Sequence, residues 1–258
     1  MAMTRERTYT GTVTQALCLV AGLASSVVQF APAAFGGEAR CEVPPELTRV
    51  EFTLPHLNAR LQAGNPVKIV AIGGASTTGA AAGSPELAYP HRLQENLDRW
   101  YPGIPIMVVN KGVPRQTAQQ MLDRFASDVF AEDPVLVIWE TGTTDAVRGV
   151  EVDDFARALQ SGIDELKTRS IDIMLVDMQF SRGTVTVIDF ERYLDTLHKV
   201  AEDNGIYVFP RFEMMRYWSE QNVFNFDGVA KDQRADLAAS VYECIGRRLA
   251  EIIREALR

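Results

Sequence analysis

Residues 68–76 read Lys-Ile-Val-Ala-Ile-Gly-Gly-Ala-Ser, and this stretch decides the fold class. A short, nearly continuous apolar run that ends in glycines is typical of a strand buried on both faces of a parallel sheet. Four further apolar runs follow along the chain: Ile106–Val109, Val135–Trp139, Ile171–Val176 and Ile206–Phe209. The sequence therefore predicts a sheet of five parallel strands.

Helical patterns lie between these runs. Within 151–168 the apolar residues are spaced by three or four positions, as on one face of a helix. The stretch near 187–203 ends at Asn204-Gly205, a common helix C-cap, and 232–257 has the pattern of a final helix. Strands and helices that alternate, with right-handed crossovers, predict a three-layer, doubly wound α/β domain of the flavodoxin-like type.

The composition is that of an ordinary globular protein. Of 258 residues, 47% are hydrophobic and 23% are charged, which excludes a disordered chain, a collagen-like repeat and a coiled coil. The 26 basic and 34 acidic residues give a net charge of −8. Because a polyanion would be repelled on average, nucleic acid is not expected as a partner.

The N-terminal residues 1–40 differ from the rest of the chain. Two arginines precede an uncharged stretch, 8–37, whose apolar centre covers 16–28, and small residues follow in 31–34. This is the pattern of a cleaved signal peptide. The alternative is a membrane anchor, but the 13 residues of the centre are fewer than the ~20 that a span needs. We expect a signal peptide and short arm at 1–40, a single domain at 41–258, and a periplasmic or secreted protein without stable membrane insertion.

Two cysteines, Cys41 and Cys244, remain once Cys18 is removed with the signal peptide. A disulfide between them would join the N-terminal arm to the last helix. The loop it closes is long enough for a stabilisation of about 4–5 kcal/mol in the chain-entropy model. The alternative is two unrelated small buried residues.

Small and polar residues follow the strands, where the functional groups of such sheets gather. Glycines and hydroxyls occupy 73–83 after the first strand. Asn110-Lys-Gly112 follows the second strand, Glu140–Asp145 the third, and Asp227–Ala230 precedes the last helix. No Gly-Lys-Ser/Thr follows the first strand, so a P-loop is not indicated.

In order and spacing, these blocks resemble those of the SGNH/GDSL hydrolase family over roughly residues 66–255. The resemblance implies hydrolysis of an ester by a serine, with a histidine as base and an aspartate that orients it. It also implies an oxyanion hole made by the serine N–H, a glycine N–H and an asparagine amide, and no metal or organic cofactor. Gly112, Gly142, Asp145 and Asp227 match the family blocks. The flanking Tyr89-Pro90 is similar to the exported bacterial branch, which implies a glycan or other surface ester as the ligand.

Three positions depart from the family pattern. If Gly73 and Gly79 are the family glycines, Ala75 occupies the position of the serine. The competing register, Gly74-Ala75-Ser76, restores a serine but shortens its distance to Gly79 by one residue. Thr144 stands where the oxyanion asparagine belongs, and Ala230 stands where the base histidine belongs. Without a base, a serine hydroxyl is a poor nucleophile.

Another side chain would then have to accept the proton. Of the 3 histidines, His56 precedes the domain, and His198 is expected at the edge of the sheet away from the site. His91, at the start of the first helix after the first strand, is the candidate replacement base. Glu140 and Asp177 end strands at the correct edge and are either acids or bases with raised pKa values or caps of neighbouring loop amides.

Two functional hypotheses follow. In the first, the protein is an esterase or deacylase with Ser76, Asp227 and His91 as catalytic residues. The residues around its oxyanion and substrate are then Gly74, Gly112, Thr144 and Asp145. In the second, hydrolysis has been lost and the same cleft binds a glycan or acyl ligand. Neither hypothesis requires a metal or a cofactor. The altered residues favour the second hypothesis, and the resemblance favours the first.

Overall fold

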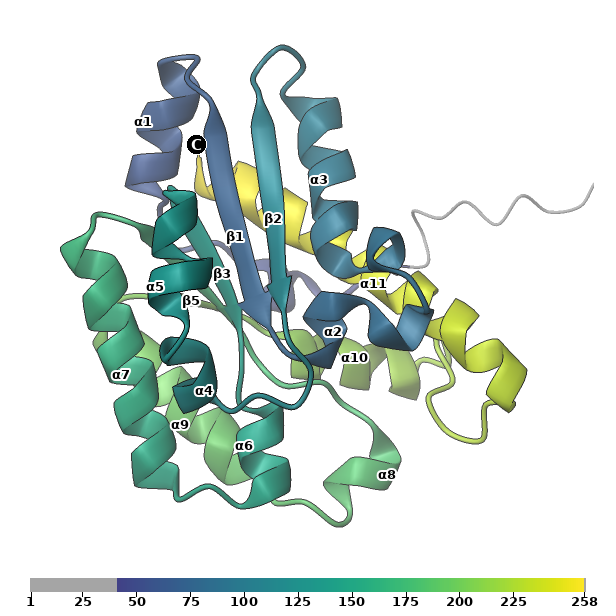
Figure 1. Cartoon of the computed structure of the whole chain (residues 1–258). Helices are drawn as coiled ribbons and strands as arrows, with labels where there is room; N and C mark the ends of the chain where they lie inside the picture. The colour runs from purple at the N-terminus through teal and green to yellow at the C-terminus, as the bar shows by residue number, and fades with distance from the viewer. Residues whose placement is uncertain (1–40, 258) are drawn as a thin grey trace, which may run out of the picture. The chain divides into compact units, whose positions relative to one another are not determined.

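The computed structural model describes residues 41–257; the expected signal peptide and arm lie outside these residues. The described chain contains a five-stranded sheet in the order β2-β1-β3-β4-β5, with every pair parallel (Figure 1). The strands are β1 (Val67–Gly73), β2 (Ile106–Gly112), β3 (Leu136–Glu140), β4 (Asp172–Val176) and β5 (Tyr207–Phe209). The fold class expected from the sequence is confirmed.

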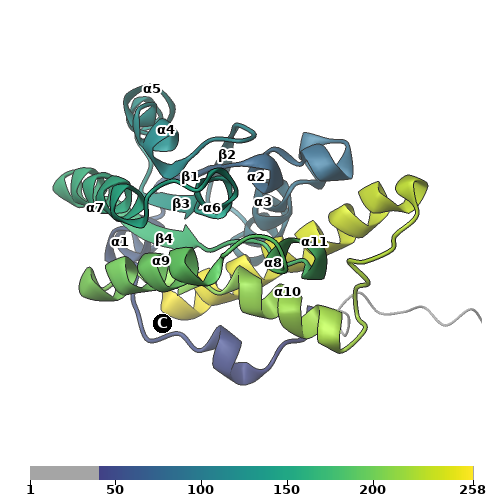
Figure 2. The same cartoon turned by 90° about the horizontal axis from the view of Figure 1, so that it is seen from below.

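Helices connect the strands and cover both faces of the sheet. They are α1 (Pro55–Gln62), α2 (Ala75–Thr78), α3 (Tyr89–Trp100), α4 (Ala118–Leu122), α5 (Phe125–Asp128), α6 (Thr143–Arg148), α7 (Val152–Thr168), α8 (Arg182–Val185), α9 (Glu191–Asp203), α10 (Arg211–Glu220) and α11 (Arg234–Ala256). Helices α3 and α11 pack together on one face, and α4, α7 and α9 lie side by side on the other (Figure 2). In Figure 1 the strands point downwards, so α2 and α6 lie at their carboxyl ends.

The centre of the sheet forms the core because its strands carry apolar side chains on both faces. Residues 69–72 of β1 and 136–139 of β3 are completely buried. Between these two strands the chain order reverses, since β1 pairs with β2 on one side and with β3 on the other. Ligands of open α/β sheets bind at the carboxyl ends of strands beside such a reversal. The stretch 211–218 forms most of α10, and its Phe212, Met214, Met215 and Trp218 are buried as core.

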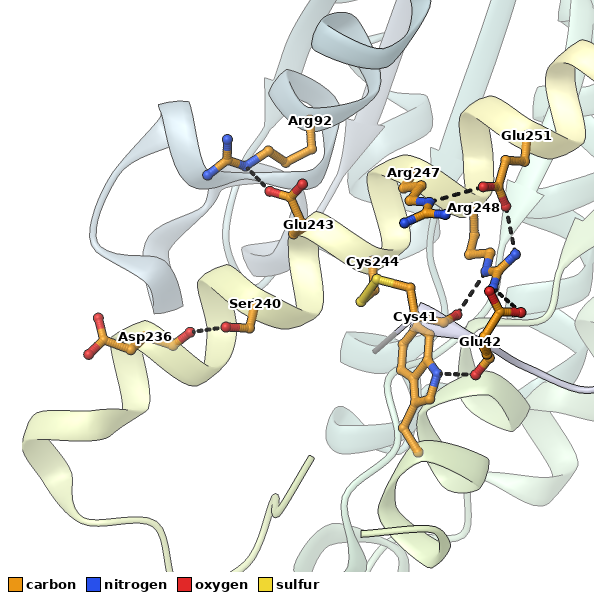
Figure 3. The surroundings of a disulfide bond; sticks show 11 residues. Cys41, Glu42, Arg92, Asp236, Ser240, Glu243, Cys244, Arg247, Arg248 and Glu251 are labelled. Carbon is orange, nitrogen blue, oxygen red and sulfur yellow. Dashed lines mark hydrogen bonds and ion pairs between the residues drawn. A yellow bond between two sulfur atoms is a disulfide. The ribbon is translucent and has the colours of Figure 1, made fainter. Parts of the chain in front are cut away.

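The expected disulfide is present between Cys41 and Cys244, which are 203 residues apart in the sequence (Figure 3). It attaches the start of the described chain to α11, and both cysteines are buried. Further contacts hold 41–42 in the same place: Arg248 Nε donates to the Cys41 carbonyl, and Trp218 Nε1 donates to the Glu42 carbonyl. Residues 41–42 are therefore an integral part of the domain. None of the helices in the described part of the chain has the length and apolar character of a membrane span.

Candidate functional site

A cavity of about 240 Å³ lies at the carboxyl ends of β1 and β3, where the strand order reverses. It is lined by 74–76 after β1, 115–116 after β2, 140–144 and 147–148 around α6, and Met121 and Gln179. We refer to it as the cleft. A larger cavity, about 600 Å³, lies between α1 and the loops that precede β3 and β4. It contains none of the site residues expected from the sequence, so we place the candidate site in the cleft.

The start of helix α2 determines which residue after β1 faces the cleft. Gly74 is its N-cap, Ala75 is exposed in the cleft, and Ser76 is 4% exposed. The Ser76 hydroxyl donates to Gln179 Oε1 at 3.3 Å. Burial and the charge of Glu140 raise the pKa of the neighbouring Tyr242 phenol, so this group is not a base at neutral pH. The groups in contact with Ser76 are thus an amide and a protonated phenol.

The two glycines that favour the first register are both required by the backbone. Gly79 has φ 77°, and a Cβ at this position would lie 2.5 Å from the Ser84 carbonyl oxygen. A Cβ at Gly73 would lie 2.1 Å from Thr77 Oγ1. This agrees with the register in which Ala75, rather than Ser76, occupies the position of the family serine.

Glu140, at the end of β3, binds the start of α2. Its Oε2 accepts hydrogen bonds from Gly74 N at 3.1 Å, Thr77 N at 3.3 Å and Thr77 Oγ1 at 2.7 Å. Its Oε1 lies 3.2 Å from Arg211 Nη2, and both side chains are buried. Of the two sequence-based interpretations of Glu140, these contacts support the cap of a loop amide. The carboxylate fixes the position of Ala75 and Ser76 and is already fully engaged.

Asp145 and Thr144 have different surroundings although they are adjacent. The Asp145 carboxylate is buried and accepts from Ala118 N at 3.1 Å through each oxygen, which attaches α6 to the start of α4. Burial raises its pKa to about 6, partly offset by the Ala118 hydrogen bond. Thr144 lines the cleft, but Asp145 does not. Gly142 holds this turn with φ 91°, a left-handed conformation that residues with side chains rarely adopt.

Besides Asp145, three further expected site residues lie apart from the cleft lining. Gly112 N donates to Asn110 Oδ1 at 2.9 Å, and its lack of a side chain allows close approach of Thr78 N. Asp227 Oδ2 lies 3.7 Å from Arg182 Nε, and His91 Nε2 lies 3.7 Å from Glu95 Oε1 on the surface of α3. In the described residues no hydrogen bond or ion pair joins Ser76 to Asp227 or His91. The structure does not assemble these three residues into a triad.

The expectation for His198 is wrong. Helix α9 begins at Glu191, later than the sequence suggested, so His198 lies only about two turns from its start. There His198 Nε2 lies 3.3 Å from Asp177 Oδ2 at the carboxyl end of β4. This hydrogen bond raises the pKa of His198, and burial raises that of Asp177, whose Oδ1 also accepts from Phe212 N at 2.8 Å. The pair borders a separate cavity of about 530 Å³ beside α9.

Several residues of the site were missed by the sequence analysis. Arg115, Thr141 and Gln179 line the cleft, and Arg211 neutralises Glu140. Arg211 follows β5 at the carboxyl edge of the sheet. A charged residue at this edge could have indicated its place in the site. Gln179 lies in a loop without a recognisable motif. Among residues 41–257, no group of 3 or more His, Cys, Asp or Glu side chains is placed to hold a metal ion.

The fold and the position of the cleft define the class: this is an SGNH/GDSL esterase-like domain. Within that class the chain belongs to the non-GDSL lipase-like family, whose model matches residues 40–258. No protein with a curated description matches the chain.

Solved structures show the same fold at low sequence identity. A protein described as a putative lipolytic protein of the G-D-S-L family from Desulfitobacterium hafniense DCB-2 is 23% identical, with a TM-score of 0.56 over 72% of this chain and 99% of that one. A two-domain esterase active on acetylated mannans is 18% identical, with a TM-score of 0.66 over 83% of this chain and 58% of that one. A catalytic mutant of Axe2, an acetylxylan esterase from Geobacillus stearothermophilus, is 18% identical, with a TM-score of 0.57 over 74% of this chain and 94% of that one.

Proposed function

We propose that this protein binds an acyl ester, on a glycan or a similar molecule, in the cleft and does not hydrolyse it by a serine mechanism. The observation that carries the proposal is the environment of Ser76. Its hydroxyl is buried and donates to Gln179, and neither of its side-chain partners in residues 41–257, Gln179 and Tyr242, accepts a proton at neutral pH. A serine without a base is a weak nucleophile.

The other altered positions support the same function. Ala75 is the exposed residue at the head of α2, and it has no nucleophilic atom. Thr144 reaches less far into the cleft than an asparagine amide would. Ala230 precedes α11 without a titratable group. The catalytic mutant of Axe2, a protein of similar fold, likewise has alanine in place of a serine.

The absence of hydrolysis is tested with p-nitrophenyl acetate and a fluorophosphonate probe. We expect wild type and Ser76→Ala to give the same background rate, and neither to be labelled covalently. A wild-type rate well above that of Ser76→Ala, together with labelling of Ser76, would establish the esterase alternative.

Ligand binding is tested by isothermal titration calorimetry with acetylated xylo-oligosaccharides and their deacetylated forms. Val147 is 57% exposed and lines the cleft, so Val147→Trp should obstruct it. Val187 is 79% exposed and does not line the cleft, so Val187→Trp is the matched control. We expect the acetylated ligand to bind to wild type and to the control but not to Val147→Trp. Equal heats for all three proteins would contradict binding in the cleft.

A third experiment restores the family residues. The variant Ala75→Ser/Thr144→Asn/Ala230→His supplies a nucleophile, an oxyanion donor and a base. We expect it to hydrolyse p-nitrophenyl acetate faster than wild type. The control is the same variant without Ala75→Ser, which should remain at background.

We also propose that the protein is exported. The uncharged N-terminal stretch is typical of a signal peptide, and a buried disulfide is typical of proteins in oxidising compartments. Mass spectrometry of the protein from a periplasmic or culture fraction should find a mature N-terminus within 31–41. Recovery of the full-length chain in the cytoplasm with reduced cysteines would contradict export.

A further inference from the structure

Two arginines line the cleft. Arg115 is exposed, adopts a left-handed backbone conformation with φ 62°, and pairs with no carboxylate among residues 41–257. Arg148, at the end of α6, donates from Nη1 to Gln120 Oε1 at 3.3 Å. The carboxylate of Asp145, one turn earlier on α6, is close enough to interact with the Arg148 charge, but it is held by Ala118. Both guanidinium groups therefore retain donors for a ligand.

The one acidic residue in the cleft lining does not cancel these charges. Glu140 is neutralised by Arg211 and accepts three further hydrogen bonds from Gly74 and Thr77. The uncompensated charge in the cleft is consequently positive.

Apolar side chains complete the lining. Met121 and Val147 contribute to the same cavity of about 240 Å³. This volume is below the roughly 300–1,000 Å³ of pockets for drug-sized ligands. It suits one sugar ring or one short acyl group.

We infer that the ligand of the cleft carries a carboxylate, bound by Arg115 and Arg148. Guanidinium groups match carboxylates in shape and charge. Met121 and Val147 contact the carbon atoms of the ring or acyl group. This inference rests on the proposed binding function and specifies the ligand class. The carboxylate belongs either to an O-acylated sugar acid or to a small free carboxylic acid.

Matched probes test the charge. An O-acetylated methyl hexuronoside and the corresponding O-acetylated methyl hexoside differ only in a carboxylate that replaces a hydroxymethyl group. In calorimetry we expect wild type to bind the uronoside at least about tenfold more tightly, because the hexoside has no carboxylate for charge-assisted hydrogen bonds with the two guanidinium groups. Acetate is the third probe, because it carries the carboxylate without the sugar. Competition by acetate at similar affinity would assign the carboxylate to a free acid; failure to compete would assign it to the sugar.

Matched variants test the residues. Arg115→Gln and Arg148→Gln should each remove most of the preference for the uronoside. Arg157→Gln, at an arginine on α7 outside the cleft, should leave it unchanged.

The outcomes separate this inference from the proposed function. One contrary result is that wild type and both arginine variants bind uronoside and hexoside with equal affinity while Val147→Trp abolishes binding of both. That result would overturn the inference that the ligand carries a carboxylate and would leave the proposed ester binding intact. Failure of every probe to bind, together with a fluorophosphonate adduct on Ser76, would overturn the proposed function itself.

Discussion

Glu140 and Arg211 form an ion pair beneath the cleft, with Oε1 and Nη2 separated by 3.2 Å and side chains that are 5% and 1% exposed. The pair joins the end of β3 to the start of α10. The same carboxylate also binds two backbone N–H groups of 74–77, so one side chain positions α2 and neutralises a buried cation.

Replacing one partner of this pair should therefore be costly. We expect Glu140→Gln to lower the free energy of unfolding by about 3–5 kcal/mol, because it removes the carboxylate that pairs directly with the buried Arg211 charge. Chemical denaturation measures the change. Glu132→Gln, at a partly exposed carboxylate between Lys68 and Lys111, is the control and should cost far less, because water screens these charges. An equal cost for the two variants would contradict the role given to Glu140.

The disulfide should contribute substantially to stability. We expect Cys41→Ser/Cys244→Ser to lower the free energy of unfolding by about 4–5 kcal/mol in the chain-entropy model. Reducing agent should destabilise wild type by a similar amount and leave the double variant unchanged. If reduction shifted both proteins equally, the effect would not come from this bond.

Asp145 should make stability fall as the pH rises. Its folded pKa is about 6, against an ordinary 3.8, so the folded protein holds a proton that the unfolded chain has released between these values. The free energy of unfolding should decrease across this range by about 3 kcal/mol, at about 1.4 kcal/mol per pKa unit. Asp145→Asn should flatten the profile and be more stable than wild type at pH 7. Asp153→Asn, at an exposed position of α7, should leave the profile unchanged.

The pair of His198 and Asp177 should affect the free energy of unfolding at a higher pH than Asp145 does. Its hydrogen bond raises the folded pKa of His198 above 6.5, so the stabilisation is complete below the unfolded pKa and is lost as the pH rises through the folded one. Denaturation between pH 5 and 9 should show this loss in wild type and not in His198→Gln. The His198 side chain is 46% exposed, so solvent should keep the effect small. Nuclear magnetic resonance titration of His198 gives its pKa directly.

The sequence predicted the sheet and its carboxyl edge because the strands are continuous apolar runs, such as 135–139, between clear helical patterns. It predicted the disulfide because only Cys41 and Cys244 remained to pair. It did not predict the surroundings of Ser76, since Gln179 and Tyr242 approach it from other elements and only the folded chain brings them together. His198 was predicted at the wrong edge of the sheet because α9 begins a few residues later than expected. An error of this size shifts a side chain along the helix axis by about one turn.

The position of Glu140 bears on the design of a Gly-Asp-Ser turn in this protein. A Cβ at Gly74 would lie 3.8 Å and 4.0 Å from the two Glu140 carboxylate oxygens. An aspartate at 74 would thus place a second acidic group beside the first. A design that introduces this turn should therefore change positions 74 and 140 together.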